Sequence, residues 1–140
     1  MATSRPQVLS DCYDLPVTTS AHEALAWFNR GIHGLLGFRK DTPDCFHKAL
    51  AHDATFNMAH CYLGVHYLLE ESEDMVAKAR TCFERAREHT TTLTDRERDV
   101  IETQQFSFFL IRRPERRILM RQIIEMVTCS QQNLIACRHV

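Results

Sequence analysis

Apolar residues recur three and four positions apart along most of the chain, which is the period of helices that bury one face. The clearest case is residues 21–36, where Leu25, Phe28, Ile32 and Leu35 share a face. The same pattern predicts further helices at 43–52, 57–70, 74–89, from 95 to 109 or 111, 114–127 and 131–140. We therefore expect an all-α fold of about seven helices in antiparallel hairpins, after an extended lead-in over residues 1–19.

Polar residues, glycine and proline mark the expected ends of these helices. Ser20-Ala21-His22-Glu23 and Thr94-Asp95-Arg96-Glu97 both match the capping box S/T-x-x-E. Gly37 is placed to end the first helix, and Thr42-Pro43 predicts an N-cap followed by proline in the first helical position. The long apolar run at 106–111 should be helical rather than a strand, because a capping box precedes it.

One motif occurs twice. Cys45-Phe46-His47-Lys48-Ala49-Leu50-Ala51-His52 and Cys82-Phe83-Glu84-Arg85-Ala86-Arg87-Glu88-His89 both read C-F-x-[KR]-A-x-x-H, thirty-seven residues apart. Self-similarity at a period of roughly 20 to 50 residues indicates a stacked repeat architecture. On a helix the Phe and the later Ala share one stripe, where the ring fills a hole and the Ala lets a neighbouring helix approach. Because this is packing chemistry, function is expected on a surface.

The two motif-bearing segments resemble the tetratricopeptide repeat, whose pattern is W-x2-L-G-x2-Y in a first helix and A-x3-F-x2-A in a second. The matching structural positions are Trp27, Gly31, Phe46, Ala49, Leu63, Gly64, Tyr67, Ala79, Phe83 and Ala86. The resemblance implies a repeat domain over 20–140, with repeats at about 21–54, 57–91 and 94–128 and a partial helix at 131–140. It also implies that the helix pairs stack into a right-handed α-α solenoid.

A narrower resemblance rests on four short segments: Pro16-Val17-Thr18-Thr19-Ser20, Trp27-Phe28-Asn29-Arg30-Gly31, Leu36-Gly37-Phe38 and Leu93-Thr94-Asp95-Arg96-Glu97-Arg98. They are similar to the opening of the tetratricopeptide repeat protein 38 family, and the similarity covers about residues 11–103 well. Members of that family are several times longer, so we expect an N-terminal portion or a short relative. The resemblance supplies no catalytic residues.

In such a solenoid the first helix of each pair lines a concave groove that holds an extended or helical peptide. The residues that the resemblance places in this groove are Asn29, His33, His60, Tyr62, His66 and Arg98. The subtype that grips a peptide C-terminal carboxylate uses Lys and Asn, whereas the corresponding places here hold Phe28, Ile32 and Tyr62. We therefore expect a non-catalytic protein- or peptide-binding scaffold without that clamp.

The charge balance argues against other partners. With 17 Lys and Arg against 18 Asp and Glu, the chain has no basic excess to recruit nucleic acid or an anionic membrane. It has neither an apolar run long enough to span a membrane nor a signal peptide, so we expect a cytoplasmic protein. One basic cluster could bind nucleic acid or phosphate, but we interpret it rather as a solvated helix face or as a contact for the acidic edge 70–74 of another molecule or of further chain; it comprises Arg112, Arg113, Arg116, Arg117 and Arg121.

Eight histidines and six cysteines raise the alternatives of a metal-binding protein or a small enzyme. The densest group is His60, Cys61 and His66, but side chains six residues apart diverge on a helix, whereas ligands on one face need spacings of three or four. We expect no metal, no cofactor and no catalysis, and reduced, buried thiols. A further alternative is a truncated fragment without an independent function. The apolar segment 134–140 lacks a polar cap, which predicts self-association through the last helix.

Overall fold

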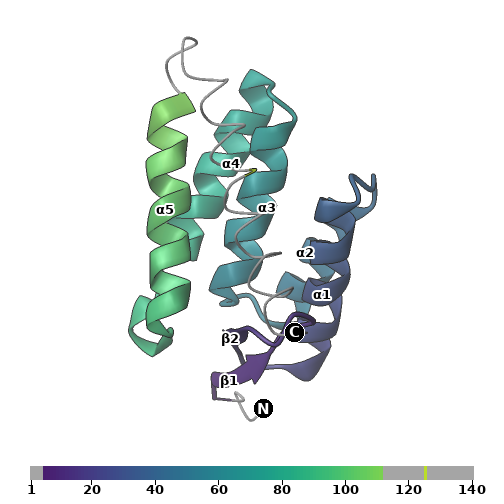
Figure 1. Cartoon of the computed structure of the whole chain (residues 1–140), viewed down its shortest axis with the longest axis vertical. Coiled ribbons are helices and arrows are strands. Elements are labelled where there is room, and N and C mark those ends of the chain that lie inside the picture. The colour runs from purple at the N-terminus through teal and green to yellow at the C-terminus, as the bar shows by residue number, and fades with distance from the viewer. Residues whose placement is uncertain (1–4, 112–124, 126–140) are drawn as a thin grey trace, which may run out of the picture. The chain divides into compact units, whose positions relative to one another are not determined.

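A computed structural model of the chain describes residues 5–111 and residue 125, with side chains over 5–104 and at 125. These residues are mostly helical, and their order can be followed in Figure 1. The elements are β1 (Gln7–Ser10), β2 (Pro16–Thr19), α1 (His22–Leu36), α2 (Thr42–His52), α3 (Asn57–Leu69), α4 (Glu73–Ala86), the 3-10 helix η1 (Thr90–Thr92) and α5 (Asp95–Ile111).

The first five predicted helices are confirmed with small shifts of their ends, and residues 106–111 are helical as expected. Several predictions fall outside the described residues: the helices at 114–127 and 131–140, most of the second half of the third repeat, the arginine cluster at 112–121, and the apolar end at 134–140. The chain divides into two compact units, Met1–Gln104 and Gln105–Val140. The contacts described below belong to the first unit.

The all-α prediction is wrong for the lead-in. Its residues form a two-stranded antiparallel sheet. β1 pairs with β2 so that Gln7 lies opposite Thr19 and Ser10 lies opposite Pro16. The turn between them is built on Asp11, whose Oδ1 accepts hydrogen bonds from the Tyr13 amide at 2.8 Å and the Leu15 amide at 3.0 Å. Asp side chains favour such turns, and the β-branched residues of β2 favour strand. A strand of four residues is too short for an alternation of apolar and polar positions to be recognised in the sequence.

Two buried carboxylates hold β2 in place. Glu97, in the first turn of α5, accepts hydrogen bonds from the Thr18 amide at 2.6 Å and the Thr18 hydroxyl at 2.8 Å. Asp53, which follows α2, accepts from the Thr19 hydroxyl at 2.6 Å and the Ser20 amide at 2.8 Å. Glu97 is 0% exposed and Asp53 is 5% exposed. β2 is therefore connected to the end of one helix and the beginning of another, far away in the sequence.

The two predicted capping boxes have different outcomes. At α5 the box forms: the Thr94 amide donates to Glu97 at 2.9 Å, and the Glu97 amide donates to the Thr94 hydroxyl at 3.3 Å. The box predicted at Ser20-Ala21-His22-Glu23 is wrong, because α1 begins at His22 after Ala21 and has no side-chain cap. The amide of Ser20 is bound by Asp53 instead, which keeps the chain extended for one residue more.

Two other helix ends differ in detail from the prediction. α1 ends before Gly37 as expected, but the residue in the left-handed region is Phe38, with φ of 53°. α2 begins at Thr42 itself, so Pro43 occupies the second helical position instead of the first. The Thr42 hydroxyl donates to the carbonyl oxygen of Arg39 at 2.8 Å, which accounts for this earlier start.

The repeated motif makes the same contact twice. Figure 1 shows α1 beside α2 and α3 beside α4. In the first pair, a Cβ added to Gly31 would lie 2.5 Å from the Phe46 ring, and in the second pair a Cβ added to Gly64 would lie 2.9 Å from the Phe83 ring. Both rings are buried, and Ala49 and Ala86, which follow them, are 0% exposed. In each pair the ring of the second helix thus lies directly on the backbone of the first.

The Gly31→Ala change should lower the free energy of unfolding by about 1–3 kcal/mol, because the added Cβ would force the buried Phe46 ring to move. This loss outweighs the roughly 1 kcal/mol by which Ala normally stabilises a helix relative to Gly. Gly64→Ala should act in the same direction but less strongly, because its closest contact is longer. Urea denaturation of the three proteins measures the differences.

Gly37→Ala is the matched control. Its φ of −90° suits any residue, and the closest contact of an added Cβ would be the His33 carbonyl oxygen at 3.1 Å, so the stability should stay within about 1 kcal/mol of the wild type. Combining Gly31→Ala with Phe46→Leu tests the contact itself, since the smaller side chain makes room for the Cβ. The double variant should be more stable than the sum of the single changes predicts, by about 1 kcal/mol. A Gly31→Ala protein as stable as the wild type would contradict the interlock.

Asp53→Asn should lower the free energy of unfolding at pH 7 by about 2 kcal/mol, because the donors of Thr19, Ser20 and Thr55 would lose a charged acceptor. Burial acts to raise the pKa of Asp53, but these hydrogen bonds outweigh it and hold the pKa below 3.8. The stabilisation is therefore present above pH 3.8 and is lost as the pH falls through the folded-state pKa.

Urea denaturation at pH 7 and at pH 3 measures this effect. The loss of stability between the two values should be smaller in Asp53→Asn than in the wild type, since the variant lacks the titrating group. An unchanged pH dependence would show that Asp53 does not hold β2 as a carboxylate.

Candidate functional site

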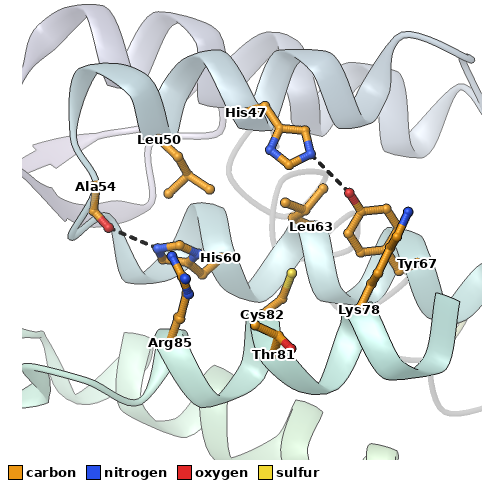
Figure 2. Close-up of a pocket in the computed structure, with 10 residues that line it drawn as sticks. All are labelled: His47, Leu50, Ala54, His60, Leu63, Tyr67, Lys78, Thr81, Cys82 and Arg85. Carbon is orange, nitrogen blue, oxygen red and sulfur yellow. Dashed lines mark hydrogen bonds between the residues drawn. The ribbon is translucent and has the colours of Figure 1, made fainter. Parts of the chain in front are cut away.

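A cavity of about 560 Å³ lies between α2, α3 and α4, with the lining side chains drawn in Figure 2. Pockets of roughly 300–1,000 Å³ are typical of ligand sites. The lining residues are His47, Leu50, Ala54, His60, Leu63, Tyr67, Lys78, Thr81, Cys82 and Arg85. On each helix they recur every three or four residues, with Thr81 and Cys82 adjacent on α4, which brings them to one face. α3 supplies the floor, and α2 and α4 supply the walls.

Two hydrogen bonds organise the histidines of this pocket, and both are drawn in Figure 2. His47 Nε2 lies 3.0 Å from the Tyr67 hydroxyl oxygen. His60 Nε2 lies 2.9 Å from the Ala54 carbonyl oxygen, and because a carbonyl can only accept, this nitrogen carries the proton. Burial lowers the pKa of His60 below 6.5, so its ring is neutral at pH 7. The permanent charges of the pocket are therefore those of Lys78 and Arg85.

These two cations are exposed, and no lining residue is acidic. The Lys78 ammonium lies 5.7 Å from the centroid of the Tyr67 ring. Neither cation belongs to the ion pairs found within the described part of the chain, which join Arg39 to Asp41, His66 to Glu70, and Arg98 to Asp95. The pocket thus combines an uncharged floor with a positively charged wall.

The six residues predicted to line one groove lie in different surroundings. His60 lines the pocket. Tyr62 is packed in an aromatic cluster, 5.6 Å from the Phe28 ring and 6.4 Å from the Phe46 ring. His66 lies on α3 and its Nε2 is 3.2 Å from the Glu70 carboxylate. The three α3 residues therefore do not share one exposed surface.

The other three groove residues are engaged by local contacts. Asn29 Oδ1 accepts a hydrogen bond from the Cys12 amide at 3.0 Å, and the His33 ring lies 6.0 Å from the Tyr13 ring. The predicted groove positions of α1 thus meet the chain's own lead-in. Arg98 binds the Asp95 carboxylate, the Leu93 carbonyl oxygen at 2.8 Å and the Thr90 carbonyl oxygen at 3.4 Å. It therefore closes the turn before α5, and the peptide groove remains a prediction.

Several predicted packing positions also contribute to surfaces. Leu63 and Tyr67 line the pocket, whereas Ala79 is fully buried. Trp27 is half-buried, and its ring lies under two cations: Lys48 from α2 at 4.4 Å and Arg30 at 4.9 Å from the centroid.

The sequence did not predict Lys78, Thr81 and Arg85 as pocket residues, because they look like the solvated face of a helix. Their three- and four-residue spacing, which matches that of His60, Leu63 and Tyr67 on the preceding helix, was the available signal.

The histidines and cysteines of the described residues were the candidates for metal binding and covalent catalysis. Among them, no group of three or more His, Cys, Asp or Glu side chains is placed to hold a metal ion. Burial raises the pKa of Cys61 to about 12 and that of Cys82 to about 11. A catalytic thiol requires the opposite shift. Over the same residues, no helix is both long and apolar enough to cross a membrane.

Comparisons of the chain with models of protein families, with curated proteins and with solved structures found no match. The resemblance to the tetratricopeptide repeat protein 38 family therefore stays a prediction from the motifs. Functional interpretation depends on the geometry of the described residues.

Cys61 and Cys82 should resist alkylation in the folded protein. With pKa values of about 12 and 11, less than roughly one thiol in a hundred is ionised at pH 8. Brief treatment with iodoacetamide at pH 8, followed by peptide mass mapping, should label Cys61 only after unfolding in urea. Cys12 is the control for access: its pKa is also raised to about 11 but its side chain is exposed, so it should be labelled slowly in the folded protein, yet faster than buried Cys61. Fast labelling of native Cys82 would contradict the raised pKa and would support a reactive, catalytic thiol.

Proposed function

We propose that this chain is a non-catalytic helical-repeat scaffold that binds a protein or peptide partner. The observation that carries the proposal is the equivalent contact of Gly31 with Phe46 and of Gly64 with Phe83, which pairs α1 with α2 and α3 with α4. Architectures built from such repeated pairs function through the surfaces created where neighbouring pairs meet. The pocket between α2, α3 and α4 is a surface of this kind, since it takes residues from both pairs.

The finer arrangement is part of the same proposal. We infer a right-handed solenoid of the tetratricopeptide type with about seven helices, of which the two motif-bearing pairs are the best supported part. The partner is expected to be an extended or helical peptide segment. Self-association through the last helix remains a prediction, and so does the expectation that nucleic acid is an unlikely partner. The last helix and the arginine cluster at 112–121 lie outside the described residues.

A cytoplasmic location belongs to the proposal as well. Its support is that Cys12, Cys45, Cys61 and Cys82 are all free thiols, three of them buried. Free thiols persist in reducing compartments. The rival interpretation, a Cys/His metal protein or a small enzyme, has less support because no group of three or more described His, Cys, Asp or Glu side chains is placed to hold a metal ion and the thiol pKa values are raised.

Selection from a random peptide library displayed on phage tests the scaffold. Peptides enriched on the folded full chain should bind the Thr81→Trp variant at least about tenfold more weakly, because the indole would fill the pocket from α4. Fluorescence polarisation with the selected peptides gives the dissociation constants.

Ala77→Trp is the matched control, since Ala77 is exposed on the same helix but does not line the pocket. The Ala77→Trp variant should bind the selected peptides with the same dissociation constants as the wild type. Enrichment of no peptide, or peptides that bind both Trp variants equally well, would count against the pocket as the binding surface of a scaffold.

A further inference from the structure

The positive wall of the pocket is made by one helix. Lys78 and Arg85 are seven residues apart on α4, so their backbones are separated by about 10 Å along the helix axis and the side chains leave the same face. Figure 2 shows Arg85 reaching towards His60 and Lys78 reaching towards Tyr67. The two charges therefore bracket the floor of the pocket.

Between these charges lie neutral groups of two kinds. Leu63 on the floor and Leu50 on the α2 wall are apolar, and Leu63 is only 2% exposed. The Thr81 hydroxyl and the hydrogen-bonded pair of His47 and Tyr67 provide polar groups at the rim. A ligand that fits this lining needs an apolar part and a group that accepts hydrogen bonds from cations.

Four carboxylates act on lining residues without lining the pocket themselves. Asp53 and Glu88 act on the His60 ring, and Glu70 and Asp44 act on the Tyr67 hydroxyl. Asp53 already accepts hydrogen bonds from Thr19, Ser20 and Thr55, which occupy both of its oxygens. The cations of α4 thus face the cavity without an acidic partner from the lining.

We propose that this pocket recognises an anionic group joined to an apolar one, of the kind that an acidic or phosphorylated side chain presents on a bound peptide. The inference deepens the proposed function and rests on it for the peptide context. Lys78 and Arg85 would bind the carboxylate or phosphate oxygens, and the leucines would contact the apolar atoms beside them. Charge-assisted hydrogen bonds of this type are about twice as strong as neutral ones.

Nuclear magnetic resonance titration of the full chain with three small probes tests the inference. Phenyl phosphate and phenylacetate carry the two anionic groups on the same ring, and benzyl alcohol is the neutral counterpart. The anions should shift the amide signals of α3 and α4 around the pocket and bind at least about tenfold more tightly than benzyl alcohol. Tighter binding of phenyl phosphate would identify a phosphorylated side chain as the source, and tighter binding of phenylacetate an Asp or Glu side chain.

Charge reversal supplies the second arm. The double variant Lys78→Glu, Arg85→Glu should weaken anion binding at least about tenfold and leave benzyl alcohol unaffected. Arg87→Glu is the matched control, because Arg87 follows the same helix, is exposed and does not line the pocket. Lys78→Gln and Arg85→Gln, which remove the charge but keep a polar, hydrogen-bonding side chain, should give intermediate losses and guard against a misfolded double variant.

Equal binding of the neutral and anionic probes, or anion binding that survives the double reversal, would overturn the inference. The peptides selected for the scaffold test keep the two proposals apart. Selected peptides that bind Arg85→Glu as tightly as the wild type would overturn the anionic pocket and leave the scaffold standing. Anion binding at the pocket without any selectable peptide would uphold the pocket and remove the scaffold.

Discussion

The close approach of a phenylalanine ring to a helix backbone determines the geometry of the described helices. Gly31 and Gly64 have no Cβ, so Phe46 and Phe83 lie where any other residue would exclude them. Because the same contact occurs in both pairs, α2 and α4 each lie at a short and similar distance from the preceding helix. This spacing leaves α3 with neighbours on two sides, and the face bearing His60, Leu63 and Tyr67 becomes the floor of the pocket.

A second constraint acts across long stretches of sequence. The hydrogen bonds of Glu97 to Thr18 span 79 residues, and those of Asp53 to Thr19 span 34. A buried carboxylate is costly unless each oxygen finds donors, and here both oxygens of both groups do. Thr is suited to this position because it offers a hydroxyl and an amide while its β-branched carbon favours the strand. The sheet is therefore part of the helical unit.

Periodicity predicted α1, α2 and α4 well because each buries one face over three or more turns, whereas α3 is buried on most of its surface. Periodicity could not predict β1 and β2, which are four residues long and held by distant side chains. The same limit separates the two capping boxes: Thr94 and Glu97 complete theirs locally, whereas the amide of Ser20 is taken by Asp53, which no local pattern reveals. The core contacts of Phe46 and Phe83 followed from the repeated motif.

The binding surface was harder to predict than the core. Asn29 and Tyr62 were chosen from a family resemblance, and the structure joins them to the lead-in and to an aromatic cluster. Lys78 and Arg85 carry no motif, because a cation on a helix face has the same sequence signature whether it faces water or a cavity. Only the packing of α2 against α3 distinguishes the two cases.

The four glycines of the chain have an unusual distribution: none has a positive φ, whereas Asp14, Phe38, Glu71 and His89 do. Three of these ordinary residues follow α1, α3 and α4, at turns where glycine would relieve roughly 1 kcal/mol of steric strain. The packing of the helices therefore holds these turns in a conformation that their own residues do not favour. A sequence of this kind can vary its connections in length and composition from one repeat to the next while the distance between its helices stays the same.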